Sequence, residues 1–110
     1  MTVKLLAFLK ARPGMKRSQF EHYYETRHVP LVLRLMPGIV DYRRNYLPEV
    51  VAGFDVITEI WFKDRATMDA AMMIASTGAV GEQIARDEEN FLDRSATKVA
   101  FPDERGGMAA

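Results

Sequence analysis

The chain of 110 residues contains no cysteine. Disulfides, a thiolate nucleophile and cysteine-based zinc or iron–sulfur centres are therefore excluded. Its charges cancel, with 15 Lys and Arg against 15 Asp and Glu, so we expect no general attraction to nucleic acid or to an anionic membrane. The longest early apolar run, residues 5–9, is too short for a membrane span or a signal-peptide core. These features predict a cytoplasmic protein with neither nucleic acid nor membrane as a partner.

The common motifs of nucleotide binding and hydrolysis are also missing. The sequence has no GxGxxG, no Walker A motif, no GxSxG and no HExxH. It has only two histidines, His22 and His28, and their spacing of six residues keeps them off a shared helix face. We therefore expect neither a metal nor a cofactor, and any catalysis would depend on acid–base groups in a small enclosed pocket.

Patterns of apolar residues divide residues 1–101 into the elements of one globular domain. Strands are predicted at residues 3–10, 39–47, 54–62 and 96–101. Helices are predicted at residues 18–28, with a short turn at 31–36, from Asp64 to a break at 76–78, and at 80–91. The order strand, helix, strand, strand, helix, strand is that of ferredoxin-like α+β folds. A flexible C-terminal tail is expected at residues 102–110.

Local signals set the predicted helix boundaries. Ser18 and Glu21 have the spacing of a capping box, which starts the first helix at Ser18. Val29 precedes Pro30 and is pushed out of the α region, so this helix is expected to end near His28. Asp64 is a candidate N-cap for the second helical region.

The predicted strands at 3–10 and 54–62 carry apolar side chains on both faces. Helices in such a fold cover one face of the sheet only, and the chain is too short to cover the other. A second copy packed sheet against sheet, with two-fold symmetry, is the economical solution. We therefore predict a homodimer through the open sheet face, which makes a dimeric α+β barrel. The alternative is an open monomer with some exposed apolar surface.

His28 is the most informative polar residue. It follows Tyr24 by four residues and Phe20 by eight, so it ends the apolar stripe of the predicted first helix. A helix C-terminus favours the imidazolium by about 0.3–1 kcal/mol, whereas burial among aromatic rings favours the neutral imidazole. A histidine between these effects can titrate near neutrality, as a general acid or base requires. The structural alternative is a histidine that bonds a helix-end carbonyl.

An acidic run, residues 87–89, lies late in the last predicted helix. Asp87 precedes Phe91 by four residues and could therefore point inward beside that ring. An inward carboxylate near His28 would orient the imidazole or share its proton. The alternative is a solvated charge run, which is the usual role of such a sequence.

Alternating residues of the second predicted strand place Tyr42, Arg44 and Tyr46 on one face. An arginine among tyrosines could bind a carboxylate, phenolate or enolate, with the phenol hydroxyls as further donors. A dimer interface enriched in Tyr and Arg is the equal alternative. Trp61 could likewise line a substrate pocket or lie in the dimer interface, and the dimer contact is favoured. Tyr24 is the remaining candidate for a substrate contact.

The chain resembles the EthD family in several segments. They are Leu5-Leu6-Ala7-Phe8-Leu9-Lys10, Arg12-Pro13-Gly14-Met15, Phe20 with Tyr24, His28-Val29-Pro30-Leu31, Pro37-Gly38-Ile39, Tyr42-Arg43-Arg44-Asn45, Asp87-Glu88 and Phe91-Leu92-Asp93. The similarity spans about residues 3–101. It implies a dimeric α+β barrel with a small pocket between sheet and helices and no cofactor. It also implies pocket positions for His28 and Asp87, because these residues match the family's helix-one histidine and its acidic position.

Three functional hypotheses follow. The first is a cofactor-independent enzyme doing acid–base chemistry, such as cyclisation, dehydration, isomerisation or decarboxylation, on an aromatic or polyketide-like carbonyl compound. His28 would be its base or acid, Asp87 its partner, and Arg44 with the tyrosines would stabilise negative charge. The second is a cofactor-free monooxygenase or an accessory of ether or aromatic degradation. The third is a non-catalytic binder of a hydrophobic metabolite.

Overall fold

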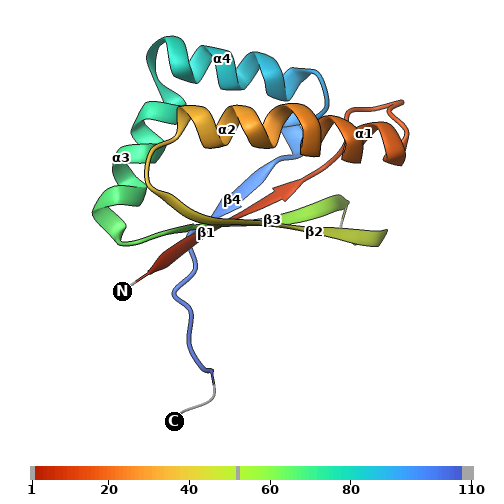
Figure 1. Cartoon of the computed structure of the whole chain (residues 1–110). Coiled ribbons are helices and arrows are strands. Elements are labelled where there is room, and N and C mark those ends of the chain that lie inside the picture. Colours follow the sequence, from red (N-terminus) through yellow and green to blue (C-terminus); the bar gives the residue numbers. More distant parts are fainter. Residues whose placement is uncertain (1, 52, 108–110) are drawn as a thin grey trace.

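Four antiparallel strands form a single sheet in the computed structural model, which describes residues 2–51 and 53–107 (Figure 1). The strands are β1 (Val3–Leu9), β2 (Ile39–Val51), β3 (Phe54–Phe62) and β4 (Lys98–Ala100). Their order across the sheet is β2-β3-β1-β4, so the two central strands are the first and third of the chain. This topology is the ferredoxin-like arrangement predicted from the order of elements.

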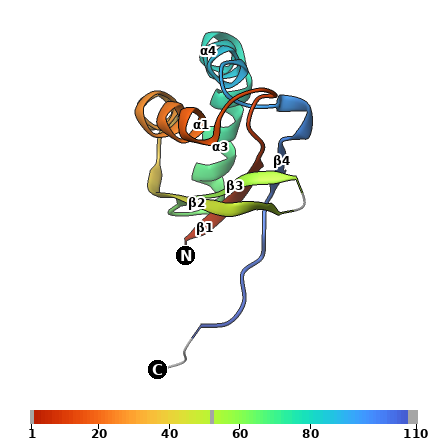
Figure 2. The same cartoon turned by 90° about the vertical axis from the view of Figure 1, so that its right-hand side faces the viewer.

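Helices cover one face of this sheet (Figures 1 and 2). They are α1 (Arg17–Tyr23), a π-helical segment η1 (Tyr24–His28), α2 (Val29–Leu35), α3 (Arg65–Ser76), α4 (Gly78–Glu89) and a 3-10 turn η2 (Arg94–Ala96). The other face carries no helix among the described residues. The predicted α+β fold with helices on one side is therefore confirmed.

Pro30 predicted that the first helix ends near His28. The structure shows that it does not. Helical backbone continues through η1 into α2, and the Val29 N–H bonds the Tyr24 carbonyl five residues back. Because backbone hydrogen bonds in the π turn reach five residues back, the first positions of α2 need no hydrogen bond to the carbonyl four residues back. The ring of Pro30, which has no N–H, therefore fits there. His28 consequently lies inside a long helix and not at its C-terminus.

The capping box expected at Ser18 and Glu21 is also wrong. The helix begins one residue earlier, at Arg17, and the Gln19 side chain accepts a hydrogen bond from the Lys16 backbone N–H at 3.1 Å. Glu21 instead pairs with Arg17 at 2.8 Å, one helical turn back. The spacing rule chose the wrong pair because two overlapping polar pairs compete for the same helix start.

Other predicted boundaries agree with the structure or differ by a few residues. Asp64 caps α3 by accepting from the Thr67 N–H at 2.8 Å, and Thr77 separates α3 from α4 as expected. Strand β2 continues to Val51, beyond the predicted end at residue 47, whereas β4 is shorter than predicted because η2 takes residues 94–96. Part of the predicted loop at 48–53 lies outside the described residues.

The core lies between the sheet and the helices and has two clusters. Buried members of the first come from β1, β3, α2, α3 and α4: Leu5, Val32, Met36, Ile60, Phe62, Met68, Ala71 and Ile84. The second surrounds α1 and the end of α4: Leu9, Phe20, Tyr24, Val29, Val56, Phe91 and Leu92. Alternate residues of β3 supply both clusters from one face of the sheet, with Val56 in the second cluster and Ile60 and Phe62 in the first.

The opposite face of the sheet stays open. Its central strands present partly buried apolar side chains, with Phe8 beside Phe54 at 5.5 Å between ring centroids and Trp61 under the Lys4 ammonium at 4.7 Å. From β4 the chain leaves past this face without regular structure through residue 107 (Figure 1), and Glu104 pairs with Lys4 at 2.9 Å. Residues 108–110 of the predicted tail lie outside the described residues. None of the helices described is long and apolar enough to cross a membrane.

Candidate functional site

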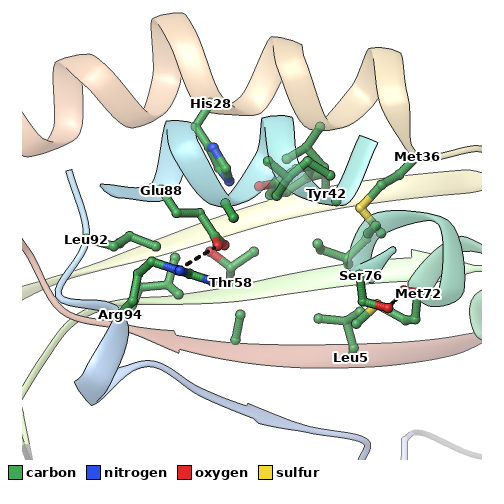
Figure 3. Close-up of a pocket in the computed structure, with 18 of the residues that line it drawn as sticks. Leu5, His28, Met36, Tyr42, Thr58, Met72, Ser76, Glu88, Leu92 and Arg94 are labelled. Atoms are coloured by element: carbon green, nitrogen blue, oxygen red, sulfur yellow. Dashed lines mark hydrogen bonds and ion pairs between the residues drawn. The ribbon is translucent and has the colours of Figure 1, made fainter. Parts of the chain in front are cut away.

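A cavity of about 380 Å³ lies between the sheet and the helix layer (Figure 3). Most of its wall is aliphatic, with Leu5 and Ile60 from the sheet and Val32, Met36 and Ile84 from the helices. Polar groups enter it at a few points only: Tyr24, His28, Tyr42, Thr58, Ser76, Glu88 and Arg94. An apolar chamber with a few polar groups is the usual form of a small-molecule site.

The π segment places His28 on the cavity wall. The imidazole is 5% exposed, packs on Phe91 at 4.8 Å between ring centroids, and points into the chamber (Figure 3). Its Nδ1 lies 2.7 Å from the Asp87 carboxylate of α4. The ring nitrogen left for the cavity is therefore Nε2, which makes no hydrogen bond to any residue that the structure describes.

Asp87 is itself held from two sides. The Tyr23 hydroxyl donates to its Oδ1 at 2.6 Å, while Oδ2 faces His28. The Asn90 amide donates in turn to the Tyr23 oxygen at 2.9 Å. This chain of contacts fixes the carboxylate plane, so its position relative to the imidazole is set by α1 and α4 together.

The charge state of His28 follows from its burial. Removal from water lowers the pKa of His28 below its ordinary value of 6.5, and this effect outweighs the Asp87 carboxylate, which raises it. The neutral imidazole carries one proton, and the carboxylate at Nδ1 holds it there as a donor. Nε2 then presents a lone pair to the cavity, which is the arrangement of a general base. The helix-end dipole expected from the sequence plays no part.

Three hydroxyl groups meet on the cavity wall where η1 lies against β2 and β3. The Tyr24 oxygen lies 2.6 Å from the Thr58 hydroxyl and 3.0 Å from that of Tyr42. Burial raises the pKa of Tyr24 to about 12 and raises the pKa of Tyr42 well above its ordinary value. All three groups therefore stay protonated, and together they can donate a hydrogen bond to an oxygen in the chamber.

Arg44 and Tyr46 face the helices but do not line this cavity. Arg44 donates to both Glu25 carboxylate oxygens, at 2.9 and 2.6 Å, and to the Tyr42 carbonyl at 2.6 Å. The Tyr46 hydroxyl also donates to Glu25 at 2.6 Å. The anion that Arg44 was expected to receive from a substrate is thus supplied by the protein's own helix.

Trp61 lies on the open face of the sheet, away from the cavity. Its neighbour on β1 is Lys4. The Lys4 ammonium lies over the indole and also forms an ion pair with Glu59 at 3.0 Å. The sheet therefore separates Trp61 from His28. His22 is exposed, and no group of three metal-ligating side chains occurs within residues 2–51 and 53–107.

Comparison with known proteins identifies the family. The model of the EthD domain matches residues 12–95, which is most of the chain. This protein belongs to the EthD family. A search of curated proteins gives no match.

Solved structures agree with the fold of this EthD domain. A crystal structure of an ethyl tert-butyl ether degradation (EthD) family protein from Bacillus halodurans is 23% identical, with 96% of this chain and 100% of that chain covered and a TM-score of 0.68. SnoaB, a cofactor-independent oxygenase from Streptomyces nogalater, is 13% identical over 99% and 98% of the two chains, with a TM-score of 0.66. A dimeric ferredoxin-like protein of unknown function from Jannaschia is 13% identical over 94% and 100%, with a TM-score of 0.62.

The EthD fold brings His28, Asp87, Tyr24 and Tyr42 together, and it adds two charged residues that sequence reasoning left out. Glu88 and Arg94 both line the cavity, 3.4 Å apart between Oε1 and Nε. Helix periodicity places Glu88 on the same face as Ile84 and Phe91, but Glu88 was not among the residues predicted for the site. Arg94 lies in a turn after α4, where no periodicity predicts a direction.

Proposed function

We propose that this EthD protein is a cofactor-independent enzyme that moves protons on an apolar, aromatic or polyketide-like carbonyl compound. One observation carries the proposal: the His28 imidazole is oriented by Asp87 at 2.7 Å and turns its free nitrogen into an apolar cavity. A structural histidine needs one satisfied nitrogen, whereas a base needs a positioned lone pair facing open space. A pure carrier of hydrophobic ligands needs neither the imidazole nor its carboxylate.

The chemical step uses groups already in place. Nε2 of His28 takes a proton from a carbon next to the substrate carbonyl, and Asp87 stabilises the imidazolium that forms. The hydrogen-bonded hydroxyls of Tyr24, Tyr42 and Thr58 together donate one hydrogen bond to the enolate oxygen that develops. Return of the proton to another atom completes an isomerisation. In a dehydration, hydroxide leaves the enolate and departs as water with the proton from His28. In a cyclisation, the enolate carbon attacks a second carbonyl carbon, and the oxygen of that carbonyl takes the proton.

Deuterium exchange tests this step without knowledge of the natural product. We expect the protein to accelerate C–H exchange of a bicyclic ketone such as 2-tetralone in D₂O, followed by proton NMR. His28→Ala should lower the rate by about 10²–10⁴-fold, the usual contribution of one acid–base group. The matched control is His22→Ala, because His22 is exposed. Equal exchange rates for the wild type and His28→Ala would remove the proposed role.

A second candidate is a cofactor-free oxygenase, which the likeness to SnoaB favours. Proton removal by His28 would make an electron-rich carbanion that reacts with O₂. An activated CH₂ would become C=O, with one oxygen atom entering the product and the other leaving as water, so the substrate supplies all four electrons. Oxygen uptake with an electron-rich phenolic substrate, measured at an electrode, separates this reaction from simple proton transfer.

We also propose a homodimer through the open sheet face. Neighbouring folds from Jannaschia and from Thermobifida fusca are described as dimeric ferredoxin-like proteins. In this chain the open face carries partly buried Leu6, Phe8, Ile57 and Trp61. Burial of such side chains against a second copy removes apolar surface from water, which stabilises a dimer.

A further inference from the structure

Arg94 is a cavity arginine whose donors are largely unused. Its guanidinium contacts Glu88 at 3.4 Å through Nε and Glu89 at 4.0 Å through Nη1, both longer than the about 2.7–2.9 Å of a charge-assisted hydrogen bond. We propose that Arg94 binds an anionic oxygen of the ligand, such as a phenolate or carboxylate, at the polar end of the cavity. This inference rests on the proposed function, because it names the substrate class of the same site.

The contrast with Arg44 supports this assignment. Arg44 makes three hydrogen bonds of 2.6–2.9 Å to Glu25 and to the Tyr42 carbonyl. Arg94 makes only the two longer ion-pair contacts to Glu88 and Glu89 among the described residues, and its side chain is 50% exposed. An arginine fork with free donors beside an apolar chamber matches the geometry of an oxyanion.

Glu88 gives the site a second charge of opposite sign. Its carboxylate lines the cavity between His28 and Arg94 (Figure 3), and burial raises the pKa of Glu88 while Arg94 lowers it. Among the described residues, Glu88 is the nearest counter-ion of Arg94. A ligand anion at Arg94 would therefore compete with Glu88 and be repelled by it.

The remaining wall defines the rest of the ligand. Aliphatic side chains such as Leu5, Val32 and Ile84 surround the chamber, and His28 lies at the same end as Glu88 (Figure 3). A chamber of about 380 Å³ accommodates a compound of two or three fused rings. The ligand class is thus an apolar ring system with one acidic oxygen, placed so that the reacting carbon faces His28.

Two matched probes test the inference: naphthalene-2-sulfonate, which stays ionised, and the neutral 2-(methylsulfonyl)naphthalene. Calorimetry measures affinity, and NMR signals of the His28 ring report occupancy of the cavity. We expect Arg94→Gln to weaken sulfonate binding by about 10-fold or more and to change methyl sulfone binding less than about 2-fold. Glu88→Gln should strengthen sulfonate binding several-fold. Arg86→Gln, on the exposed side of α4, is the control.

The outcomes separate the two proposals. If the methyl sulfone binds and Arg94→Gln leaves sulfonate affinity unchanged, or weakens both probes equally, the anion site is wrong and the proposed ligand cavity stands. If neither probe moves the His28 signals, the aromatic-ligand cavity fails and the anion site fails with it. Thermal denaturation confirms that each variant is folded, and Arg94→Lys should keep part of the sulfonate preference because it keeps the charge.

Discussion

His28 on the π segment and Asp87 on α4 are 59 residues apart in the chain and 2.7 Å apart in the structure. Tyr23, from the turn before His28, donates to the second oxygen of the same carboxylate. The carboxylate therefore joins two neighbouring turns of one helix to another helix. It fixes both the position and the tautomer of the imidazole that faces the cavity.

Asp87→Asn should reverse the tautomer of His28. The Tyr23 hydroxyl donates to the remaining oxygen, so the new amide NH₂ turns toward Nδ1 and forces that nitrogen to accept. Nε2 then carries the proton and no longer acts as a base, which should lower turnover or deuterium exchange by about 10²-fold or more. Nitrogen-15 NMR of the imidazole reads the tautomer directly.

The control for that experiment is Glu82→Gln, an exposed position of α4 that pairs with Arg86 at the surface. It should leave both the tautomer and the rate unchanged. If Asp87→Asn retains full exchange activity with an altered nitrogen-15 spectrum, the proton transfer does not use Nε2.

Acidification should destabilise the protein through His28. Its folded pKa lies below the ordinary 6.5, so the unfolded chain binds the proton first as pH falls. The stabilising effect of the neutral ring is complete above about pH 6.5 and is lost as pH falls toward the folded pKa, at about 1.4 kcal/mol per pH unit between the two pKa values. Urea denaturation at about pH 7.5 and about pH 5.5 measures this loss.

His28→Asn isolates the histidine contribution from the carboxylates that also titrate in acid. The wild type should lose more unfolding free energy than His28→Asn over the same pH interval. An equal loss in both proteins would mean that His28 has the same pKa in the folded and unfolded states.

Gly38 should tolerate alanine worse than Gly14. Both residues have positive φ, 84° and 81°, so alanine strains either backbone by about 1–2 kcal/mol. At Gly38 a Cβ would also meet the Thr67 methyl group, whereas nothing lies near it at Gly14. We expect Gly38→Ala to cost about 1–3 kcal/mol more than Gly14→Ala in urea denaturation, because that contact adds overpacking. Equal costs would show that Thr67 moves aside freely.

Ile57→Glu should give a monomer. Ile57 lies on the open sheet face opposite Phe8 of β1, where a second copy would bury it. An unpaired carboxylate in such an interface is strongly unfavourable. Light scattering should show the 12.5 kDa chain for the variant and twice that mass for the wild type. Ala70→Glu, exposed on α3, is the control. A wild-type protein of monomer mass would contradict the predicted interface.

The sequence by itself determined the order and type of the elements, because these depend on local periodicity. The alternation of β3 placed Val56 and Ile60 on one face and Trp61 on the other, and Asp64 marked the start of α3. It also brought forward His28 and Asp87 as candidates, since helical spacing from Tyr24 and Phe91 turns both toward the aromatic core.

Only the tertiary structure decided which partners these residues have. Pro30 signals a helix end locally, yet packing against the sheet and α4 sustains a π turn that keeps the helix continuous through His28. Arg44 was predicted either to bind an anion or to lie in a dimer interface, and the structure pairs it with Glu25, 19 residues earlier in the chain. Arg94 reaches the cavity from a turn, where direction depends on contacts between elements distant in the chain and no sequence period encodes it.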